Sequence, residues 1–534
     1  MNSTTIKRNT LFGAAALAVA MIGQALAQAP APARQLTPQE RRGKQIYLLG
    51  TSTSGRPITA FLGDPPTEIS ATALTCVGCH GLDGLGRPEG GVTPSNIVWE
   101  SLTKSYGSGP SSDRKHPAYT ERALELSLTR GLDPGGNRLT NAMPRYELAR
   151  DDMADLIAYL KQLGKEQDPG LTEKSVHIGT VIPSDGPMAD AGEAVSALLA
   201  AYFAEVNSQG GVYGRKLELR VARLPKVVSE RRASVERFIK DQQVFAMTGA
   251  FIAGAEKEFA VLMETEEVPL VGPFTLMPQS GFPVNRQVFY LLSGMPDQAR
   301  ALVNFARQKI GASTRAAILF SAGEINDAVV AAIAEQSKKA GLQPPVIIDT
   351  TRRPFESDRL AGELKRSGAD AVFLLGSGAE AIALLKAAEK LDWAPSIFLP
   401  GALSSRELFD APSKFKDKIF LSFPTLPSDQ DKLSLQELNA VAEKHDLSAK
   451  HLAVQISAYC AAKMLVEGMR LAGRELSREK LIGALEGFYE FNTGLTPRMT
   501  FGPNRRTGAC GAYVVTVDLE KRGFTPASEW IAAN

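Results

Sequence analysis

Cysteine is scarce in this chain, with four in 534 residues, and charge of one sign is scarce too, since the formal net charge is +2. Four thiols are too few for a fold held together by disulfides. A nearly balanced charge gives no argument for nucleic acid as a partner. After residue 26 no apolar run is long enough to cross a bilayer. The larger, C-terminal part shows no Ser/His/Asp or paired-carboxylate arrangement that indicates hydrolysis.

The first residues have the features of a secretory signal peptide. Residues 1–27 combine a positive start, an apolar run over 11–26 and a small-residue triplet at 25–27. We therefore expect cleavage before Gln28 and a periplasmic protein. A membrane anchor is the alternative, but the run is short and a glutamine interrupts it. Residues 28–36 are rich in Pro and Ala, which predicts a spacer.

The chain also contains Cys76-Val77-Gly78-Cys79-His80, the attachment signature of a c-type haem. The two thiols form thioethers with the two haem vinyl groups, and the histidine after the second cysteine reaches the iron. A zinc site would need a second ligand pair with similar spacing, whereas Cys460 and Cys510 are isolated. A thioredoxin-like motif would lie at a strand-to-helix turn of a βαβ unit, which the Thr, Gly and Asp residues nearby do not indicate. Cys460 lies in an apolar helical pattern, and its pairing with Cys510 stays open.

Two predicted helices flank this motif. The first begins near Thr37, a good N-terminal cap, and the second begins at Asp151 or Asp152 and has an apolar stripe up to residue 163. Gly43 in the first helix has no side chain, so another helix can cross closely there, beside Tyr47. The sequence gives no assignment for residues 50–72.

Residues 37–163 resemble a small class I c-type cytochrome. The resemblance is carried by Gly43, Tyr47, the Cys76 to His80 motif, Met143-Pro144-Arg145-Tyr146 and Tyr159-Leu160. It implies a small all-α domain with one covalently attached haem c. It also implies that Met143, in a loop before the last helix, is the sixth ligand of the iron.

Met143 has competitors for this role. His116 lies in a polar loop, and Met153 belongs to the apolar stripe of the last helix, where a core position is expected. The alternative for Met143 itself is a buried residue that fills a gap. A thioether ligand favours ferrous iron and raises the reduction potential. Residues 93–99 are expected to line the haem edge.

Residues 164–174 end the last helix of this domain and read as a linker. Beyond them, over 175–534, short apolar strands alternate with longer amphipathic helices, which predicts an α/β fold with parallel sheets. Two successive series of this kind indicate two lobes.

The segment from about 175 to 520 resembles the type I periplasmic binding proteins, the branched-chain amino-acid (Leu/Ile/Val-binding-like) group of ABC-importer receptors. The resemblance is carried by residues 207–217 and 511–515, which are structural turns and strands. The ligand of such a fold lies between the lobes, at the carboxyl ends of the strands. The residues expected at or near this cleft are Ser184, Asp185, Phe251, Phe274, Thr275, Glu324 and Ser377.

Amino-acid specificity is not carried over with this resemblance. Relatives that bind amino acids hold the carboxylate with Ser/Thr hydroxyls and backbone N–H groups in the loop after a first-lobe strand, and here that loop, residues 249–253, has no hydroxyl. Phe251 and Phe274 indicate a more apolar or aromatic pocket. A place in the core of the lobe is the alternative for both rings.

Together these patterns predict a periplasmic electron-transfer protein with one haem c and a domain that binds a small molecule. We expect a redox partner, such as a periplasmic dehydrogenase or another cytochrome. The alternative is a receptor for an ABC permease in which the haem domain is accessory. We do not expect an enzyme, because iron that binds both His80 and Met143 has no open position for a substrate.

Overall fold

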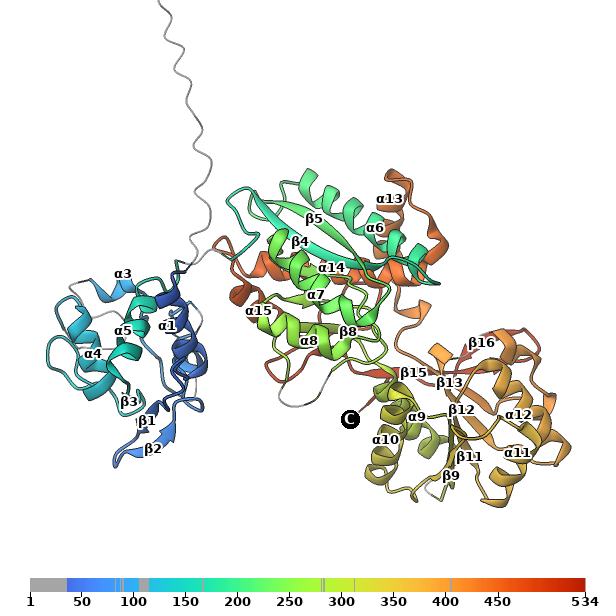
Figure 1. The fold of residues 1–534 in the computed structure, drawn as a ribbon. Helices are drawn as coiled ribbons and strands as arrows, with labels where there is room; N and C mark the ends of the chain where they lie inside the picture. Colours follow the sequence, from blue (N-terminus) through green and yellow to red (C-terminus); the bar gives the residue numbers. More distant parts are fainter. Residues whose placement is uncertain are drawn as a thin grey trace, which may run out of the picture.

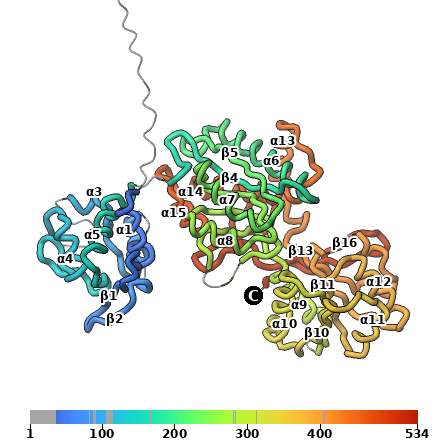
Figure 2. Tube along the Cα trace, in the orientation of Figure 1, coloured from blue at the N-terminus to red at the C-terminus, as the bar shows by residue number. Residues whose placement is uncertain are grey.

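The computed structural model describes most of the chain (Figures 1 and 2). The predicted signal peptide lies outside the described residues, and so does most of the Pro/Ala spacer. The described residues are 36–81, 83–86, 88, 91–104, 115–165, 168–279, 281, 284–311, 313–403 and 406–533. No helix in these ranges is long and apolar enough to cross a membrane.

The N-terminal domain consists mainly of helices, with a small antiparallel sheet in the order β2-β1-β3. Its elements are α1 (Pro38–Leu49), β1 (Thr59–Leu62), β2 (Thr67–Ser70), α2 (Cys76–His80), α3 (Trp99–Leu102), α4 (Glu121–Arg130), β3 (Arg145–Glu147) and α5 (Arg150–Leu160). The helices agree with the predicted cytochrome fold. The sheet corrects the all-α expectation, because the unassigned segment 50–72 pairs its two strands as a hairpin and adds β3 at its edge.

The crossing of α1 and α5 holds this domain together. Helix α1 begins as predicted, because the Thr37 side chain accepts from the Glu40 N–H at 3.2 Å and the Glu40 carboxylate accepts from the Thr37 N–H at 2.7 Å. At Gly43 the helices are so close that a Cβ atom would lie 1.9 Å from the Asp155 carbonyl oxygen. Tyr47 is fully buried one turn later, with its ring centroid 5.5 Å from that of Tyr159.

The first lobe of the larger domain is built on a sheet in the order β14-β8-β7-β6-β4-β5, in which every neighbouring pair is parallel. Helices α6 and α14 pack against this sheet. Its elements are β4 (Ser175–Pro183), α6 (Ala189–Ser208), β5 (Lys216–Leu224), α7 (Val228–Asp241), β6 (Ala246–Thr248), α8 (Glu256–Thr265), β7 (Leu270–Val271), β8 (Val288–Leu292), α13 (Lys432–Lys444), α14 (Leu452–Leu471), α15 (Arg478–Glu486) and β14 (Thr507–Ala509). We call this part lobe 1.

The second lobe, lobe 2, is built on a mixed sheet in the order β10-β9-β11-β12-β13-β15-β16, with β17 paired to β15. Buried side chains form separate apolar clusters in this lobe, one with α11 and α12 and one with α9 and α10. Its elements are α9 (Met295–Ile310), β9 (Ala316–Phe320), α10 (Glu324–Lys339), β10 (Val346–Asp349), α11 (Ser357–Arg366), β11 (Ala371–Leu375), α12 (Gly378–Lys390), β12 (Ser396–Pro400), β13 (Ile419–Phe423), β15 (Gly511–Asp518), β16 (Gly523–Pro526) and β17 (Ile531–Ala532).

The chain passes between the lobes at several places. It leaves lobe 1 between β8 and α9, returns between β13 and α13, and crosses again at Cys510, between β14 and β15. Both sheets therefore contain strands that are distant in sequence. Figure 1 shows the lobes side by side, joined at these crossings. This two-lobed α/β architecture agrees with the prediction from the alternating pattern. The prediction of parallel sheets is wrong for one edge of lobe 2, where β15 pairs antiparallel with β13, β16 and β17.

The linker is attached to lobe 1 by a buried arginine. The Arg478 side chain donates to the carbonyl oxygens of Val244 at 2.7 Å, Phe245 at 3.0 Å and Glu266 at 3.0 Å. Its backbone N–H donates to the Asp168 carboxylate at 2.6 Å. Nearby, Lys44 of α1 forms an ion pair with Glu267 of lobe 1 at 3.5 Å. The N-terminal domain is thus joined to lobe 1.

The close crossing at Gly43 gives a stability prediction. Gly43→Ala should destabilise the N-terminal domain by about 3 kcal/mol, because the new methyl group overlaps backbone atoms of α5 that cannot move independently. Denaturant unfolding followed at the haem absorbance measures this change. Gly483→Ala in α15 is the control, since no atom lies within 4 Å of a Cβ there. Equal unfolding midpoints for Gly43→Ala and the unchanged protein would contradict the prediction.

Candidate functional site

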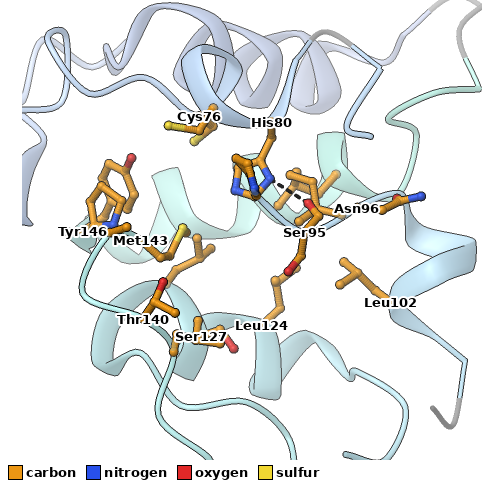
Figure 3. A pocket seen from close by; sticks show the side chains of 18 of the residues that line it. Cys76, His80, Ser95, Asn96, Leu102, Leu124, Ser127, Thr140, Met143 and Tyr146 are labelled. Carbon is orange, nitrogen blue, oxygen red and sulfur yellow. Dashed lines mark hydrogen bonds between the residues drawn. The ribbon is translucent and has the colours of Figure 1, made fainter. Parts of the chain in front are cut away.

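A cavity in the N-terminal domain brings together the residues that the sequence singled out (Figure 3). Cys76, Cys79 and His80 line it from α2, and Met143 lines it from the loop before β3. Tyr47 holds the end of α2 in place, since its buried hydroxyl donates to the Gly81 carbonyl at 2.6 Å. The remaining wall is largely apolar and includes Leu74, Ile97, Leu102, Leu124, Leu128, Leu156 and Leu160.

His80 is held in the tautomer that a metal requires. Its Nδ1 lies 3.0 Å from the Ser95 carbonyl oxygen. A carbonyl oxygen only accepts, so Nδ1 carries the proton and Nε2 keeps its lone pair. The side chain is buried, and desolvation lowers the pKa of His80, which keeps the imidazole neutral. Figure 3 shows the ring entering the cavity from α2.

Cys76 and Cys79 lie on one helical turn, and neither is in a disulfide. Burial raises the pKa of Cys76 to about 12, so its thiol is protonated at neutral pH. A protonated thiol can add across a vinyl group, with sulfur bonding to one carbon and the proton going to the other. The addition needs no oxidant, and two such thiols on one turn can bind two neighbouring substituents of a planar ring.

Met143 lies in a loop that wraps around a guanidinium group. Arg145 donates to the Leu139 carbonyl at 3.2 Å, to the Thr140 carbonyl at 3.3 Å and to the carbonyl of Met143 itself. These bonds fix the loop, and the Met143 side chain reaches into the cavity (Figure 3). Sequence reasoning noted Arg145 as part of a motif but missed this role, because loop carbonyl groups have no sequence signal.

The structure places Met153 and His116, the alternatives to Met143 as sixth iron ligand, in different surroundings. Met153 is buried in α5 and is not among the residues that line the cavity, which agrees with the expected core position. His116 does line the cavity, and its Nδ1 lies 2.8 Å from the Pro117 carbonyl oxygen. Residues 93–97 also line the cavity, but Trp99 does not, and the Lys161 ammonium lies 5.5 Å from its ring centroid.

The cavity fits a covalently attached haem. Its wall offers an imidazole nitrogen and a thioether sulfur, the pair of axial donors found in cytochromes c, together with two thiols and a mainly apolar surface. Among the described residues, no group of three or more His, Cys, Asp or Glu residues could hold a metal ion. The position of His80 and Met143 on the cavity wall, together with the resemblance to cytochromes c, makes them the candidate iron ligands.

The cleft candidates of lobe 1 follow neighbouring strands. Ser184 and Asp185 are exposed after β4, and Asp185 forms an ion pair with Lys226 at 2.9 Å. Phe251 follows β6 and Phe274 follows β7, and their ring centroids are 4.6 Å apart. Phe251 is 6% exposed and belongs to the lobe core, as the alternative interpretation held.

The other cleft candidates already have partners. The Thr275 hydroxyl donates to Glu256 at 2.6 Å. Glu324, at the start of α10 in lobe 2, pairs with Lys257 of lobe 1 at 2.8 Å, so the two lobes meet there. Ser377 is the N-terminal cap of α12, because its hydroxyl accepts from the Glu380 N–H at 3.3 Å. Its hydroxyl thus has a structural role.

Two family models match this chain, which combines a haem-type domain and a two-lobed binding domain. The cytochrome c family matches residues 69–164, and the periplasmic binding protein family matches residues 175–523. The second match covers more than half of the chain, so the chain belongs to the periplasmic binding protein family. No curated protein matches it in sequence.

Solved structures of similar fold include ABC-transporter proteins. A fatty acid ABC transporter substrate-binding protein from Thermomonospora curvata is 18% identical, with a TM-score of 0.52 over 68% of this chain and 94% of that one. A branched-chain amino acid ABC transporter from Thermus thermophilus with bound valine is 17% identical, with a TM-score of 0.52 over 68% and 97% of the two chains. A putative branched-chain amino acid ABC transporter from Rhodospirillum rubrum is 16% identical, with a TM-score of 0.53 over 66% and 99%. Such identities establish the fold alone.

Covalent attachment gives a direct prediction. Cys76→Ala with Cys79→Ala should abolish covalent haem, whereas each single variant should keep one thioether. Mass spectrometry of the denatured protein, produced in a periplasm competent for cytochrome c maturation, measures this. Cys460→Ala and Cys510→Ala are the matched controls and should retain the haem mass, since neither residue lines the cavity. A double variant that still carries covalent haem would refute the assignment.

Proposed function

We propose that the protein is a periplasmic electron-transfer protein with one covalently attached haem c, fused to a domain that binds a small molecule between its lobes. The observation that carries the proposal is the cavity with Cys76, Cys79, His80 and Met143 on its wall. Both matched families are typically periplasmic, which supports export through the predicted signal peptide.

In this proposal the haem supplies a metal centre that accepts and releases one electron. Cys76 and Cys79 would hold the ring, and His80 would offer Nε2 to the iron because its Nδ1 is bonded to the Ser95 carbonyl. Met143 provides a soft donor that favours the reduced state. The apolar wall excludes water from the metal. A haem held by both His80 and Met143 would have no open position for a substrate, so it would supply electron transfer to a partner.

The position of the haem domain supports an external redox partner. Figure 1 shows α1 on the side of the domain nearest lobe 1, and α4, which lines the cavity with Leu124 and Leu128, on the far side. The lobes therefore leave the α4 side accessible. A periplasmic dehydrogenase or another cytochrome is the class of partner that this arrangement suits.

A second candidate function is that of a receptor for an ABC permease, with the haem domain as an accessory. The observation that favours it is the family of the larger domain and the ABC-transporter proteins of similar fold. The two functions differ in what ligand saturation does. A coupled redox protein changes its haem potential or its rate with a partner when a ligand binds, whereas an importer receptor delivers the ligand with the haem unaffected.

Replacing the sixth ligand tests the redox assignment. Met143→Ala should lower the midpoint potential and allow carbon monoxide to bind to the ferrous haem, because one axial position opens. Redox titration and optical spectra measure both effects. Met153→Leu is the control and should change neither, since Met153 is buried in α5 away from the cavity wall.

His116 also lines the cavity, so the test includes the double variant Met143→Ala/His116→Asn. If only the double variant binds carbon monoxide, His116 takes the place of the missing thioether. If the unchanged protein binds carbon monoxide as readily as Met143→Ala, then Met143 is not the sixth ligand and the proposed electron-transfer role loses its basis.

A further inference from the structure

The loop after β6 uses its hydrogen-bond donors within lobe 1. Five backbone N–H groups in this loop donate to acceptors of lobe 1, among them the Val181 and Phe274 carbonyls, the Glu256 carboxylate and the Ile252 carbonyl of the loop itself. The donors are Gly249 at 3.2 Å, Phe251 at 2.9 Å, Ile252 at 3.2 Å, Gly254 at 2.9 Å and Ala255 at 2.9 Å. Since the loop also lacks hydroxyl side chains, it has few donors to offer to a ligand carboxylate.

A carboxylate of the chain itself lies at this place. One oxygen of Glu256 accepts from the Gly254 N–H at 2.9 Å, and the other accepts from the Thr275 hydroxyl at 2.6 Å. Glu256 is the first residue of α8, where the helix dipole favours a negative charge. An anionic ligand that approached the start of α8 would therefore meet a negative charge that already accepts these two hydrogen bonds.

The nearby lysines also have partners within the protein. Lys226 pairs with Asp185 at 2.9 Å, and Lys257 pairs with Glu324 across the opening between the lobes at 2.8 Å. Each cation is neutralised by a carboxylate at contact distance. Recognition of an anionic group by either lysine would require an existing ion pair to be broken.

Exposed apolar side chains gather at the same end of the sheets. Met188 follows β4, Val227 and Val228 follow β5, Leu276 follows β7, and Ile325 stands one residue into α10 of lobe 2. They are between 39% and 53% exposed. Phe251 follows β6 and Phe274 follows β7 at this end of the sheet, and their rings are tilted by 30° to each other. Burial of such side chains against a ligand contributes about 25 cal/mol per Å² of apolar surface.

We infer that the ligand held between the lobes is an uncharged, apolar small molecule without a free carboxylate. This inference rests on the proposed solute-binding function and specifies its ligand class. The exposed apolar side chains at the strand ends provide apolar contact, and the Glu256 carboxylate already accepts from the Gly254 N–H and the Thr275 hydroxyl, donors that a ligand carboxylate could otherwise use. The same arrangement disfavours the carboxylate of a free amino acid, so we expect amino acids to bind more weakly than the matching alcohols.

Two series of matched compounds test the inference with the full-length holoprotein. One is benzyl alcohol, benzoate and L-phenylalanine, and the other is 3-methylbutan-1-ol, 3-methylbutanoate and L-leucine. Within each series the apolar group is kept or closely matched while the charge changes. Isothermal titration calorimetry should show that an alcohol binds at least tenfold more tightly than the charged members of its series.

The outcomes separate the inference from the function on which it rests. Tighter or equal binding of benzoate, 3-methylbutanoate or either amino acid overturns the inference and leaves solute binding intact. If none of the compounds binds to protein that is folded by circular dichroism, both the proposed solute binding and the inferred ligand class fail.

A charge variant tests the role of Glu256 itself. Glu256→Gln keeps an acceptor for Thr275 but removes the charge, so benzoate should gain about tenfold in affinity while benzyl alcohol changes little. Glu264→Gln is the matched control, because Glu264 is exposed near the other end of α8. Equal effects of the two variants on benzoate would overturn the role given to Glu256.

A second substitution tests whether the exposed apolar side chains at the strand ends contact the ligand. Val228→Ser should weaken alcohol binding severalfold, because it replaces an exposed apolar side chain near the ligand with a polar one. Leu471→Ser is the control, since Leu471 is similarly exposed at the end of α14. Unchanged alcohol affinity in Val228→Ser would show that the Val228 side chain does not contact the ligand and would contradict the apolar contact inferred here.

Discussion

The buried guanidinium of Arg478 determines how the two halves of this protein are joined. It donates to the carbonyl oxygens of Val244, Phe245 and Glu266, and the backbone N–H of the same residue binds Asp168 in the linker. Burial lowers the pKa of Arg478 and raises the pKa of Asp168, and their mutual attraction opposes both shifts. Without the guanidinium these carbonyl groups would lose their charged partner, at a cost of about 1–3 kcal/mol for each one left unsatisfied. The linker is thus part of the lobe 1 structure.

Much of the haem site could be predicted from the sequence, because the chemistry of attachment fixes the spacing of Cys76, Cys79 and His80. The structure brings them together with Met143, which a family resemblance had indicated. The supporting contacts could not be predicted in this way. The Ser95 carbonyl is a backbone group, and backbone groups have no sequence signature. The small sheet at 59–70 was missed because its strands are too short for a reliable alternating pattern.

In the two lobes the fold could be predicted from the sequence, but the contacts of the candidate cleft residues could not. Their fold followed from the alternation of strands and helices, whereas the ligand-binding role of the candidate cleft residues stays a prediction. What those side chains do could not be predicted, since it depends on partners that are distant in sequence. Asp185 pairs with Lys226, Thr275 with Glu256, and Glu324 with Lys257 of the other lobe. Position along a strand indicates where a side chain lies, whereas tertiary contacts decide which of its atoms are available.

The attachment of the linker to lobe 1 alone has a mechanical consequence. The N-terminal domain is attached to lobe 1 through the linker and the Lys44–Glu267 ion pair. The chain crosses to lobe 2 after β8, after β13 and at Cys510. Any change in the angle between the lobes would therefore change the position of the N-terminal domain relative to lobe 2. A partner protein that binds lobe 2 and also contacts the haem edge would fit at only one angle between the lobes. Electron tunnelling weakens steeply with distance, so the angle would act as a switch for such a partner.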